Sequence, residues 1–501
     1  MTTDREKVRL IFGLKIKQLR NDLGLSTYDL ADRTGLSPSY LNEIEKGKKY
    51  PKTEKIFALA KALNSSYDTL VSLQVSKSLE PVVELLNSNI LTELPLDLFG
   101  IEPGYFLEVM ASAPAKLSAF INTLIEIGRN YDLSVEQFYF SALRTYQAMH
   151  NNYFEELEKQ ADTFLTDYPL PELPGQYASW LIRVLNEVYG CTVEFYDETT
   201  QPALMSLRSV YLPEQQKLLV NRELSTEQQV FTLSREVGYH WLGLTIRPLE
   251  SSVLEARSFD EVLHNFQASY FARCILIPRQ QLLDKLRIMV QQPDWDNERM
   301  LQMLAQFTVT PEMFLLRVTN LLSGDFGLNN LFFLRFNQLL NGRFIMAKEL
   351  HLSKLHTPHG IARDEHYCRR QMSVTILNEL RQLQESGQWD GQPICRAQRI
   401  SFVTNNTTYF VFSIAKSSPP TPDNSSINIG FPIDETLLEK IPFIGDPKLP
   451  TVQVGETCER CPIADCTVRA APPTVLAHQQ RTKTIQATIE QLRAVSASPG
   501  K

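Results

Sequence analysis

The chain lacks the features that would place it in a membrane or on a secretory route. Its 501 residues contain no run of about 18 or more apolar residues, the length that a transmembrane helix needs. The start, Met1-Thr2-Thr3-Asp4, does not resemble a signal peptide. With only seven cysteines, we expect a cytoplasmic protein whose thiols are free or bind metal rather than form structural disulfides.

The composition is that of an ordinary globular protein, but its charge is unevenly distributed. Hydrophobic residues make up 43% and charged residues 21% of the chain, which is long enough for three or four domains. Residues 1–73 hold 13 Lys and Arg against 9 Asp and Glu, a net charge of +4. Since the whole chain carries −7, the remainder carries −11. This asymmetry favours a basic DNA-binding module attached to an acidic body.

The first 73 residues carry the pattern of five short helices. Gly24 can end the first helix in a left-handed conformation, and Ser26 can cap the second. Thr34-Gly35-Leu36 is typical of the tight turn in a helix-turn-helix. Ser37-Pro38 supplies a cap and a first-turn proline for the third helix. The pattern therefore predicts a helix-turn-helix domain.

In the third helix, Leu41 and Ile44 are expected to point inward and leave the other side chains for DNA. We predict DNA contacts from Thr27, Ser37, Ser39, Tyr40, Glu43, Lys46 and Lys48. The whole segment resembles the Xre/Cro repressor family, which implies a double-stranded DNA operator. The alternative is a small helical bundle whose lysines are only solvated.

Residues 74–170 are predicted to be helical almost throughout. Within them, Phe138, Phe140, Leu143 and Tyr146 form an aromatic and apolar stripe at helical spacing. Such a stripe favours core packing or a dimer surface over a cofactor pocket. Because repressors of this type read two half-sites, we expect a homodimer.

Residues 176–290 contain two predicted strands, at 193–195 and 217–220, and a helix beginning at Thr226. That helix contains Ser234-Arg235-Glu236-Val237-Gly238-Tyr239-His240, and Phe266-Gln267-Ala268 follows on a later helix. The order resembles the ImmA/IrrE family of regulatory metallopeptidases. In that family, two histidines and a later carboxylate bind zinc, and a glutamate is the general base.

The resemblance places different side chains at the zinc positions of this chain. The two histidine positions fall on Arg235 and Tyr239, the general base on Glu236, and the third ligand on Gln267. Arginine cannot bind zinc, and phenol and amide oxygens are poor ligands for it. We therefore predict a retained fold without catalysis, in which Arg235 can pair with Glu236 and the cleft can bind a small effector. His240 offers an alternative register with Glu236 alone.

A compact cysteine cluster lies near the C-terminus, at Cys458-Glu459-Arg460-Cys461 and Cys466. Three thiolates at this spacing need a fourth donor to complete a zinc site or an iron–sulfur cluster. The residue types alone do not choose between these two metals, and three reduced thiols in a turn are the remaining alternative. Cys395 and His366 are candidate fourth ligands.

This segment, with Arg469-Ala470-Ala471-Pro472-Pro473 after it, resembles the C-terminal domain of bacterial short-chain fatty acyl transcriptional regulators. The resemblance implies that Cys368, Cys458, Cys461 and Cys466 hold a 4Fe–4S cluster, with zinc as the alternative. It also implies a short-chain acyl-coenzyme A as the effector.

Together these patterns predict a multidomain, mainly α protein with a mixed α+β C-terminal part. The predicted domains are a five-helix helix-turn-helix domain at 1–73, a helical linker and dimerisation region at 74–174, a zincin-like α+β domain at 175–340, a β-containing cysteine-cluster sensor domain at 341–478 and a polar tail at 479–501. The predicted function is a dimeric transcription regulator that senses a metabolite or redox state. The alternatives are a metal-dependent regulatory protease and a repressor of the phage-immunity or toxin–antitoxin type.

Overall fold

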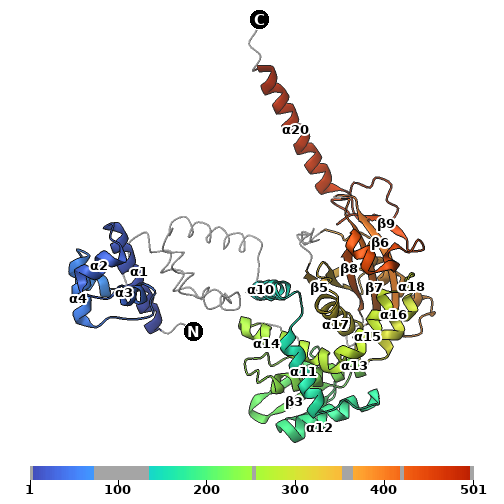
Figure 1. Cartoon of the computed structure of the whole chain (residues 1–501). Helices are drawn as coiled ribbons and strands as arrows, with labels where there is room; N and C mark the ends of the chain where they lie inside the picture. The colour runs from blue at the N-terminus through green and yellow to red at the C-terminus, as the bar shows by residue number, and fades with distance from the viewer. Residues whose placement is uncertain are drawn as a thin grey trace. The chain divides into compact units, whose positions relative to one another are not determined.

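The chain forms two compact units in the computed structural model (Figure 1). The structure describes residues 4–72, 135–250, 256–352, 365–404, 406–417 and 423–496. Unit 1 comprises Met1–Tyr146 and Glu255–Asp260, and unit 2 comprises Gln147–Leu254 and Glu261–Lys501. None of the described helices is both long and apolar enough to cross a membrane.

Unit 1 begins with five helices that share one apolar core, as the sequence predicts. They are α1 (Asp4–Asp22), α2 (Thr27–Thr34), α3 (Pro38–Glu45), α4 (Thr53–Ala62) and α5 (Tyr67–Val71). Ile16, Leu30, Leu41, Ile44 and Leu59 are completely buried among them. α10 (Val135–Met149) follows the undescribed residues 73–134 and ends at the start of unit 2.

The predicted helix ends of unit 1 are confirmed by their cap geometry. Gly24 and Gly35 adopt φ values of +65° and +68°, in the region that side chains with a Cβ rarely adopt. Ser26 and Asp29 form a capping box at the start of α2. Ser37 caps α3 by accepting a hydrogen bond from the Tyr40 amide at 3.2 Å. These local signals fix the turn between α2 and α3.

Two contacts fix how α3 crosses α1. A Cβ on Gly13 of α1 would lie 2.8 Å from the Glu45 carbonyl oxygen and still closer to that of Ile44, so only glycine fits there. Arg20 of α1 donates to both carboxylate oxygens of the buried Glu45, at 2.6 and 2.9 Å. Charged groups at such a crossing are stable because they are paired in two parallel hydrogen bonds.

Unit 2 contains a small sheet with helices packed on it. Its strands are β1 (Thr192–Tyr196), β2 (Ser209–Leu212) and β3 (Lys217–Asn221), in the order β1-β3-β2. β1 runs parallel to β3, and β2 runs antiparallel to β3. The helices before and after it are α11 (Glu155–Asp167), α12 (Tyr177–Tyr189), α13 (Thr226–Trp241), α14 (Phe259–Leu276), α15 (Arg279–Val290) and α16 (Asn297–Ala305). The predicted strands near 193 and 217 and the helix from Thr226 are confirmed.

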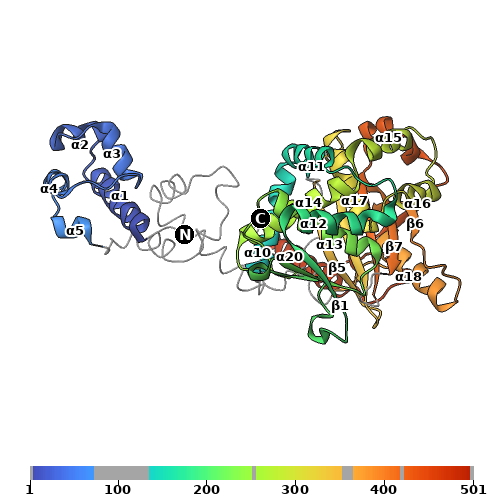
Figure 2. The ribbon, with the colours of Figure 1, turned by 90° about the horizontal axis from the view of Figure 1, so that it is seen from below.

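A six-stranded sheet forms the C-terminal half of unit 2. Its order is β5-β4-β8-β7-β6-β9, antiparallel except for the β6–β9 pair. The elements are α17 (Pro311–Gly324), β4 (Phe332–Gln338), β5 (Phe344–His351), α18 (Met372–Glu385), β6 (Ile394–Phe402), β7 (Thr408–Ser417), β8 (Asn424–Pro432), α19 (Glu435–Lys440), β9 (Thr451–Val454) and α20 (Thr474–Ser496). α18 contacts β6, β7 and β8 and lies beside β7 in both views (Figure 1 and Figure 2).

Residues 332–338, at the end of the predicted zincin-like domain, form strand β4 and belong to the six-stranded sheet. Phe332, Leu334 and Phe336 pack in the cluster with α18, while Phe333 between them is also completely buried. The strand begins with three buried apolar residues, 332–334, and alternates with the partly buried Arg335 and Asn337 only after them. Such a run resembles a buried helical segment.

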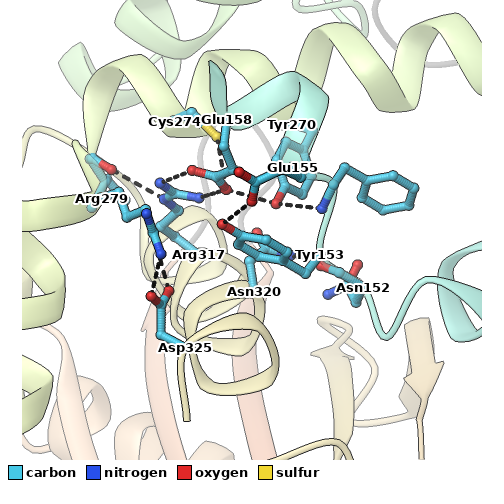
Figure 3. Close-up of polar contacts among 12 residues, drawn as sticks. Asn152, Tyr153, Glu155, Glu158, Tyr270, Cys274, Arg279, Arg317, Asn320 and Asp325 are labelled. Carbon is cyan, nitrogen blue, oxygen red and sulfur yellow. Dashed lines mark hydrogen bonds and ion pairs between the residues drawn. The ribbon is translucent and has the colours of Figure 1, made fainter. Parts of the chain in front are cut away.

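A buried polar network ties α11 to α14 and α17 within unit 2 (Figure 3). Arg317 of α17 is paired through both terminal nitrogens with Glu158 of α11, and both side chains are at most 5% exposed. Tyr270 of α14 donates to Glu158 at 2.8 Å, and Arg317 Nε donates to the Ile277 carbonyl at 3.1 Å. Burial raises the pKa of Glu158, but the charge and hydrogen bonds of Arg317 outweigh it and lower the pKa overall.

Candidate functional site

Helix α3 turns its apolar side into the core and its polar side outward. Leu41 and Ile44 are completely buried, as predicted. Of the predicted DNA-binding residues, the exposed ones are Ser37, Ser39, Lys46 and Lys48, and the partly buried ones are Thr27, Tyr40 and Glu43. The oxygen of Ser37 already caps the helix, so Ser39 is the serine with the more available hydroxyl.

Two lysines lie near the Tyr40 ring, one from α4 and one from the turn between α3 and α4. Lys55 Nζ of α4 lies 4.2 Å from the centre of the Tyr40 ring, and Lys49 Nζ lies 5.8 Å from it. Lys49 also pairs with Glu43 at 2.8 Å, which raises the pKa of the lysine. The sequence reasoning missed Lys55, because no local motif brings α4 beside α3. It also missed Tyr28, which is 73% exposed and directly follows Thr27.

In unit 2, the four residues at the implied peptidase positions lie on α13 and α14. Arg235 Nη2 lies 3.5 Å from Ser209 Oγ of β2, and Tyr239 donates to Asn265 at 3.0 Å. Gln267 is partly buried on α14. Burial lowers the pKa of Arg235 and raises that of Tyr239.

Arg247 hydrogen-bonds both carboxylate oxygens of Glu236, a partner that the sequence did not indicate. Arg247 donates to Glu236 Oε1 at 2.7 Å and to Oε2 at 2.5 Å. Its guanidinium carbon lies 4.0 Å from the Tyr211 ring centre and 3.9 Å from that of Tyr239. Arg247 lies after the end of α13, so it reaches Glu236 by folding back, a contact that sequence spacing does not reveal.

Glu236 has a second neighbour on its own helix, His240, and a third, Cys191, at the start of β1. One oxygen of Glu236, one ring nitrogen of His240 and the sulfur of Cys191 lie within 4.8 Å of one another. Among the described residues this is the only such group of three potential metal ligands. The sequence shows Glu236 and His240 as a pair one helical turn apart, whereas Cys191 joins them only through the fold.

A cavity of about 440 Å³ lies between the helices α13, α14 and α17 and the six-stranded sheet. Among the described residues that line it, Glu312 is the only carboxylate, and the cations are Arg208, Arg235, Arg273, Arg335, Lys348 and Lys416. Glu312 pairs with Arg335 at 2.6 Å and Lys348 at 3.1 Å but supplies one negative charge, and Lys416 lies 3.9 Å from Glu227 outside the lining. The cavity is therefore strongly electropositive.

Burial disfavours the charged form of three of these arginines. Burial lowers the pKa of Arg208, Arg235 and Arg273. Arg273 is 6% exposed, and its buried Nε has no hydrogen-bond partner among the described residues. A buried polar nitrogen without a partner is destabilising, and an anionic ligand would satisfy it.

The predicted cysteine ligands come from two segments that the fold brings together. The Cys368 amide donates to the Glu456 carbonyl at 3.2 Å, and the Cys458 amide donates to the His366 carbonyl at 2.9 Å. Tyr367 and Thr457 form a bridge between these backbones. Cys368, Cys458 and Cys461 are at most 5% exposed, while Cys466 is partly exposed. About ninety residues of chain separate Cys368 from this cluster, so only the fold shows that they meet.

The loop around these cysteines is held by charged and backbone groups. Arg469 donates to the carbonyl oxygens of Cys458 at 2.8 Å and Cys461 at 3.3 Å. The Ala470 amide donates to Cys458 Sγ at 3.3 Å, a contact that stabilises a thiolate. Burial and the nearby Cys461 and Cys458 raise the pKa of Cys368. Within the described chain, no three of the four sulfurs lie within 4.8 Å of one another.

The two runner-up ligands differ in their position: His366 lies beside the cluster, and Cys395 lies within the sheet. His366 Nδ1 lies 2.8 Å from Glu459 Oε1, and its carbonyl accepts a hydrogen bond from the Cys458 amide at 2.9 Å. Cys395 is completely buried in β6, and burial raises the pKa of its thiol.

Two known families match parts of this chain. The helix-turn-helix family matches residues 16–70, and the family described as IrrE N-terminal-like domain matches residues 193–319. The first match coincides with α1–α5, and the second with the three-stranded sheet and the helices α13–α17. These define an Xre-type helix-turn-helix protein with an IrrE-like domain.

Similar proteins place the chain more closely. The uncharacterized HTH-type transcriptional regulator y4dJ of Sinorhizobium fredii is 32% identical over 65 residues, which cover 13% of this chain and 84% of that protein. The chain therefore belongs to the HTH-type transcriptional regulators. The HTH-type transcriptional regulator RamB of Mycobacterium tuberculosis, strains CDC 1551 and H37Rv, is 25% identical over 292 residues. That alignment covers 54% of this chain and 58% of RamB, less than two thirds of its length.

A solved structure described as a Mycobacterium tuberculosis transcriptional regulator also matches. It superposes with a TM-score of 0.48 at 16% identity, covering 66% of this chain and 94% of that one.

Proposed function

We propose that this protein is a transcription regulator that binds double-stranded operator DNA through α3. The observation that carries this proposal is the outer surface of α3, where Ser39 and Tyr40 are available and Lys46 and Lys48 are exposed. Outward polar residues in the first turn of such a helix read base edges, while nearby cations bind phosphates. The relatives RamB and y4dJ are both described as transcriptional regulators, which supports the proposal.

The test compares operator and scrambled duplexes, after the operator has been selected from random DNA with the full chain. We expect Ser39→Ala with Tyr40→Ala to reduce the operator preference by about 1–3 kcal/mol, since base-edge contacts are lost. Lys46→Ala should weaken binding to both duplexes and reduce the dependence of log affinity on log salt concentration by about one. Fluorescence anisotropy across a salt series measures both effects.

The matched control is Arg481→Ala on α20, which removes an exposed cation from unit 2 and should leave both affinities unchanged. A folded double variant that keeps the full operator preference would refute the role of α3.

The regulator is proposed to be a homodimer. Phe138 and Phe140 on α10 are 41% and 38% exposed, so part of the predicted stripe is available to a partner. Sedimentation of the full chain measures its assembly state, and a monomer at operator-saturating concentration would contradict this step.

The IrrE-like domain is proposed to be non-catalytic. Arg247 covers both oxygens of Glu236, the general-base position, and Arg235 and Tyr239 stand at the implied zinc positions. Zinc-dependent peptide cleavage that is lost in Glu236→Gln would instead establish the alternative of a regulatory protease.

The cation-lined cavity is proposed as the effector site, with a short-chain acyl-coenzyme A as the ligand that the family resemblance implies. Coenzyme A carries phosphate groups, and charge-assisted hydrogen bonds from arginine suit such groups. An electropositive cavity with a single carboxylate fits an anionic ligand of this class.

The cysteine site is proposed to hold a 4Fe–4S cluster, with zinc as the alternative. Three buried thiols, the Ala470 amide bond to Cys458 and the Arg469-held loop fit a thiolate-ligated metal centre. Zinc–sulfur bonds of about 2.3 Å would bring all the ligating sulfurs to roughly 3.8 Å from one another, whereas no three of the four sulfurs lie within 4.8 Å of one another in the described chain. Such a cluster would supply redox sensitivity. Iron and sulfide analysis of anaerobically purified protein tests it, and absence of both would contradict it.

A further inference from the structure

Cys191, Glu236 and His240 form a group that neither the DNA-binding nor the effector proposal uses. We propose that these three side chains bind a divalent transition metal, with zinc as the natural ion. The site keeps only Glu236 from the peptidase pattern and uses none of the side chains at 235, 239 and 267. We call it the displaced metal site.

The strongest support for the proposal is the relative position of Glu236 and His240 on α13. His240 Nε2 lies 3.2 Å from Glu236 Oε1. A tetrahedral zinc ion with bonds of about 2.0–2.1 Å to nitrogen and oxygen places such atoms roughly 3.3–3.4 Å apart. His240 Nε2 is also buried and has no properly directed hydrogen bond within the described structure. Two ligand atoms therefore lie side by side at the spacing of a coordination edge.

Neighbouring elements hold all three side chains in place. Tyr189, the last residue of α12, stacks on the His240 ring with centroids 5.0 Å apart and planes 19° apart. The chain then turns at Gly190, where φ is +65°, and the Cys191 amide donates to the Leu185 carbonyl at 2.9 Å. This turn places the completely buried Cys191 thiol beside α13. Secondary structure thus positions the ligands before any metal binds.

The donor set selects the class of metal. Sulfur, imidazole nitrogen and a carboxylate oxygen suit zinc or cobalt, whereas magnesium and calcium prefer oxygen alone. The Cys191 thiol loses its proton to solvent when the metal binds, so one thiolate and one carboxylate balance the two positive charges. The site leaves a fourth position for water.

Arg247 positions Glu236 for this role. A metal on Oε1 replaces the Arg247 Nη1 contact of 2.7 Å and leaves the Nη2 contact to Oε2 at 2.5 Å. Outer groups that hydrogen-bond a ligating carboxylate orient it in this way. Arg247 and the metal therefore share the two oxygens of Glu236.

The test uses the full chain with Cys458→Ser and Cys461→Ser, which removes thiols that would compete for metal. Metal-free protein is titrated anaerobically with Co²⁺ alone, and thiolate-to-cobalt charge transfer is recorded in the near ultraviolet. We expect one Co²⁺ per chain with this band, displaced by Zn²⁺. Adding Cys191→Ser should abolish the band, whereas Cys274→Ser, which removes another buried thiol, should keep it.

A second variant covers the case in which Cys191→Ser fails to fold. The His240 side chain is 21% exposed, so His240→Gln should fold, which a circular dichroism melt checks. It should weaken Co²⁺ binding at least about tenfold, the lower effect expected from loss of a ligand interaction. No stoichiometric Co²⁺ binding by the background protein, or a band that survives Cys191→Ser, overturns the proposal. Unchanged affinity in His240→Gln also overturns it.

Discussion

At the scale of single residues, two of the buried arginine–glutamate pairs in the described part of unit 2 have different neighbours. The carboxylate of Glu158 contacts Arg317, Tyr270 and Cys274, so this pair belongs to a structural hydrogen-bond network. Glu236 and Arg247 instead lie beside two potential metal ligands. A buried ion pair is therefore not by itself a sign of function; the side chains next to it decide.

Glu158→Gln is expected to destabilise the protein at neutral pH. The change leaves the completely buried Arg317 without its counter-charge, and breaking such a pair costs about 3–5 kcal/mol. Urea unfolding of unit 2, followed by tryptophan fluorescence, measures the difference. Glu155→Gln on the same helix is the control, because its ion pair with Lys159 is solvent-exposed and should contribute less than about 1 kcal/mol.

The pH dependence of this effect has a definite sign. The folded-state pKa of Glu158 lies below its ordinary value of 4.5, so the carboxylate stabilises the fold above that pH. As the pH falls below 4.5 toward the folded-state pKa, the contribution is lost. The stability gap between the unaltered protein and Glu158→Gln should therefore narrow with acidification. A gap that widens would contradict the ion-pair interpretation.

At the scale of helices and strands, the sequence predicts an element well where its ends are marked locally. Ser26, Gly35 and Ser37-Pro38 each act on the nearest few residues, so the α2–α3 turn can be predicted without the fold. Strand β4 could not be predicted in this way. Its apolar residues indicate burial, but they do not indicate which elements cover them.

The same limit applies to the candidate sites. Glu236 and His240 are one helical turn apart and could be paired from the sequence. Cys191 and Arg247 reach them only through the fold, and Arg273 becomes a cavity residue only when α14 packs beside the sheet. For the cysteine cluster, the family resemblance supplied Cys368, which the backbone contacts with 456–458 place beside the cluster.

Gly13→Ala is expected to destabilise the α1–α3 crossing, although alanine favours a helix more than glycine does. Its Cβ would press on the backbone carbonyls of Ile44 and Glu45, which cannot move without shifting α3. Overpacking of this kind costs about 1–3 kcal/mol. Hydrogen exchange in peptides from α1 and α3 should accelerate accordingly, and operator binding should weaken. Gly175→Ala is the control, because a Cβ there meets open space, and it should change neither hydrogen exchange nor operator binding. Unaltered exchange in Gly13→Ala would show that α1 and α3 are not tightly packed where they cross.

At the scale of the whole molecule, the charge distribution separates two tasks. The first 73 residues carry +4 and the remainder −11, so the acidic body opposes non-specific attachment to DNA. Within that acidic body, six cations line one cavity. A cavity whose charge is opposite to that of its surroundings is suited to an anionic metabolite. By thermodynamic linkage, a ligand that changes operator affinity must bind with a correspondingly changed affinity to the operator complex.

Arg273→Gln is expected to separate effector binding from DNA binding. Loss of a charge-assisted hydrogen bond, worth about 1.5–3 kcal/mol, should weaken propionyl-coenzyme A binding at least about tenfold. Calorimetry of the full chain measures this affinity, and fluorescence anisotropy measures operator affinity with and without the ligand. Without ligand, the variant should bind the operator with the affinity of the unaltered protein. It should need correspondingly more ligand for the same change in operator affinity. Arg287→Gln, at an exposed arginine of α15, should behave like the unaltered protein. If Arg273→Gln binds the ligand with undiminished affinity, the ligand makes no hydrogen bond to the buried Nε of Arg273. The cavity is then not the effector site.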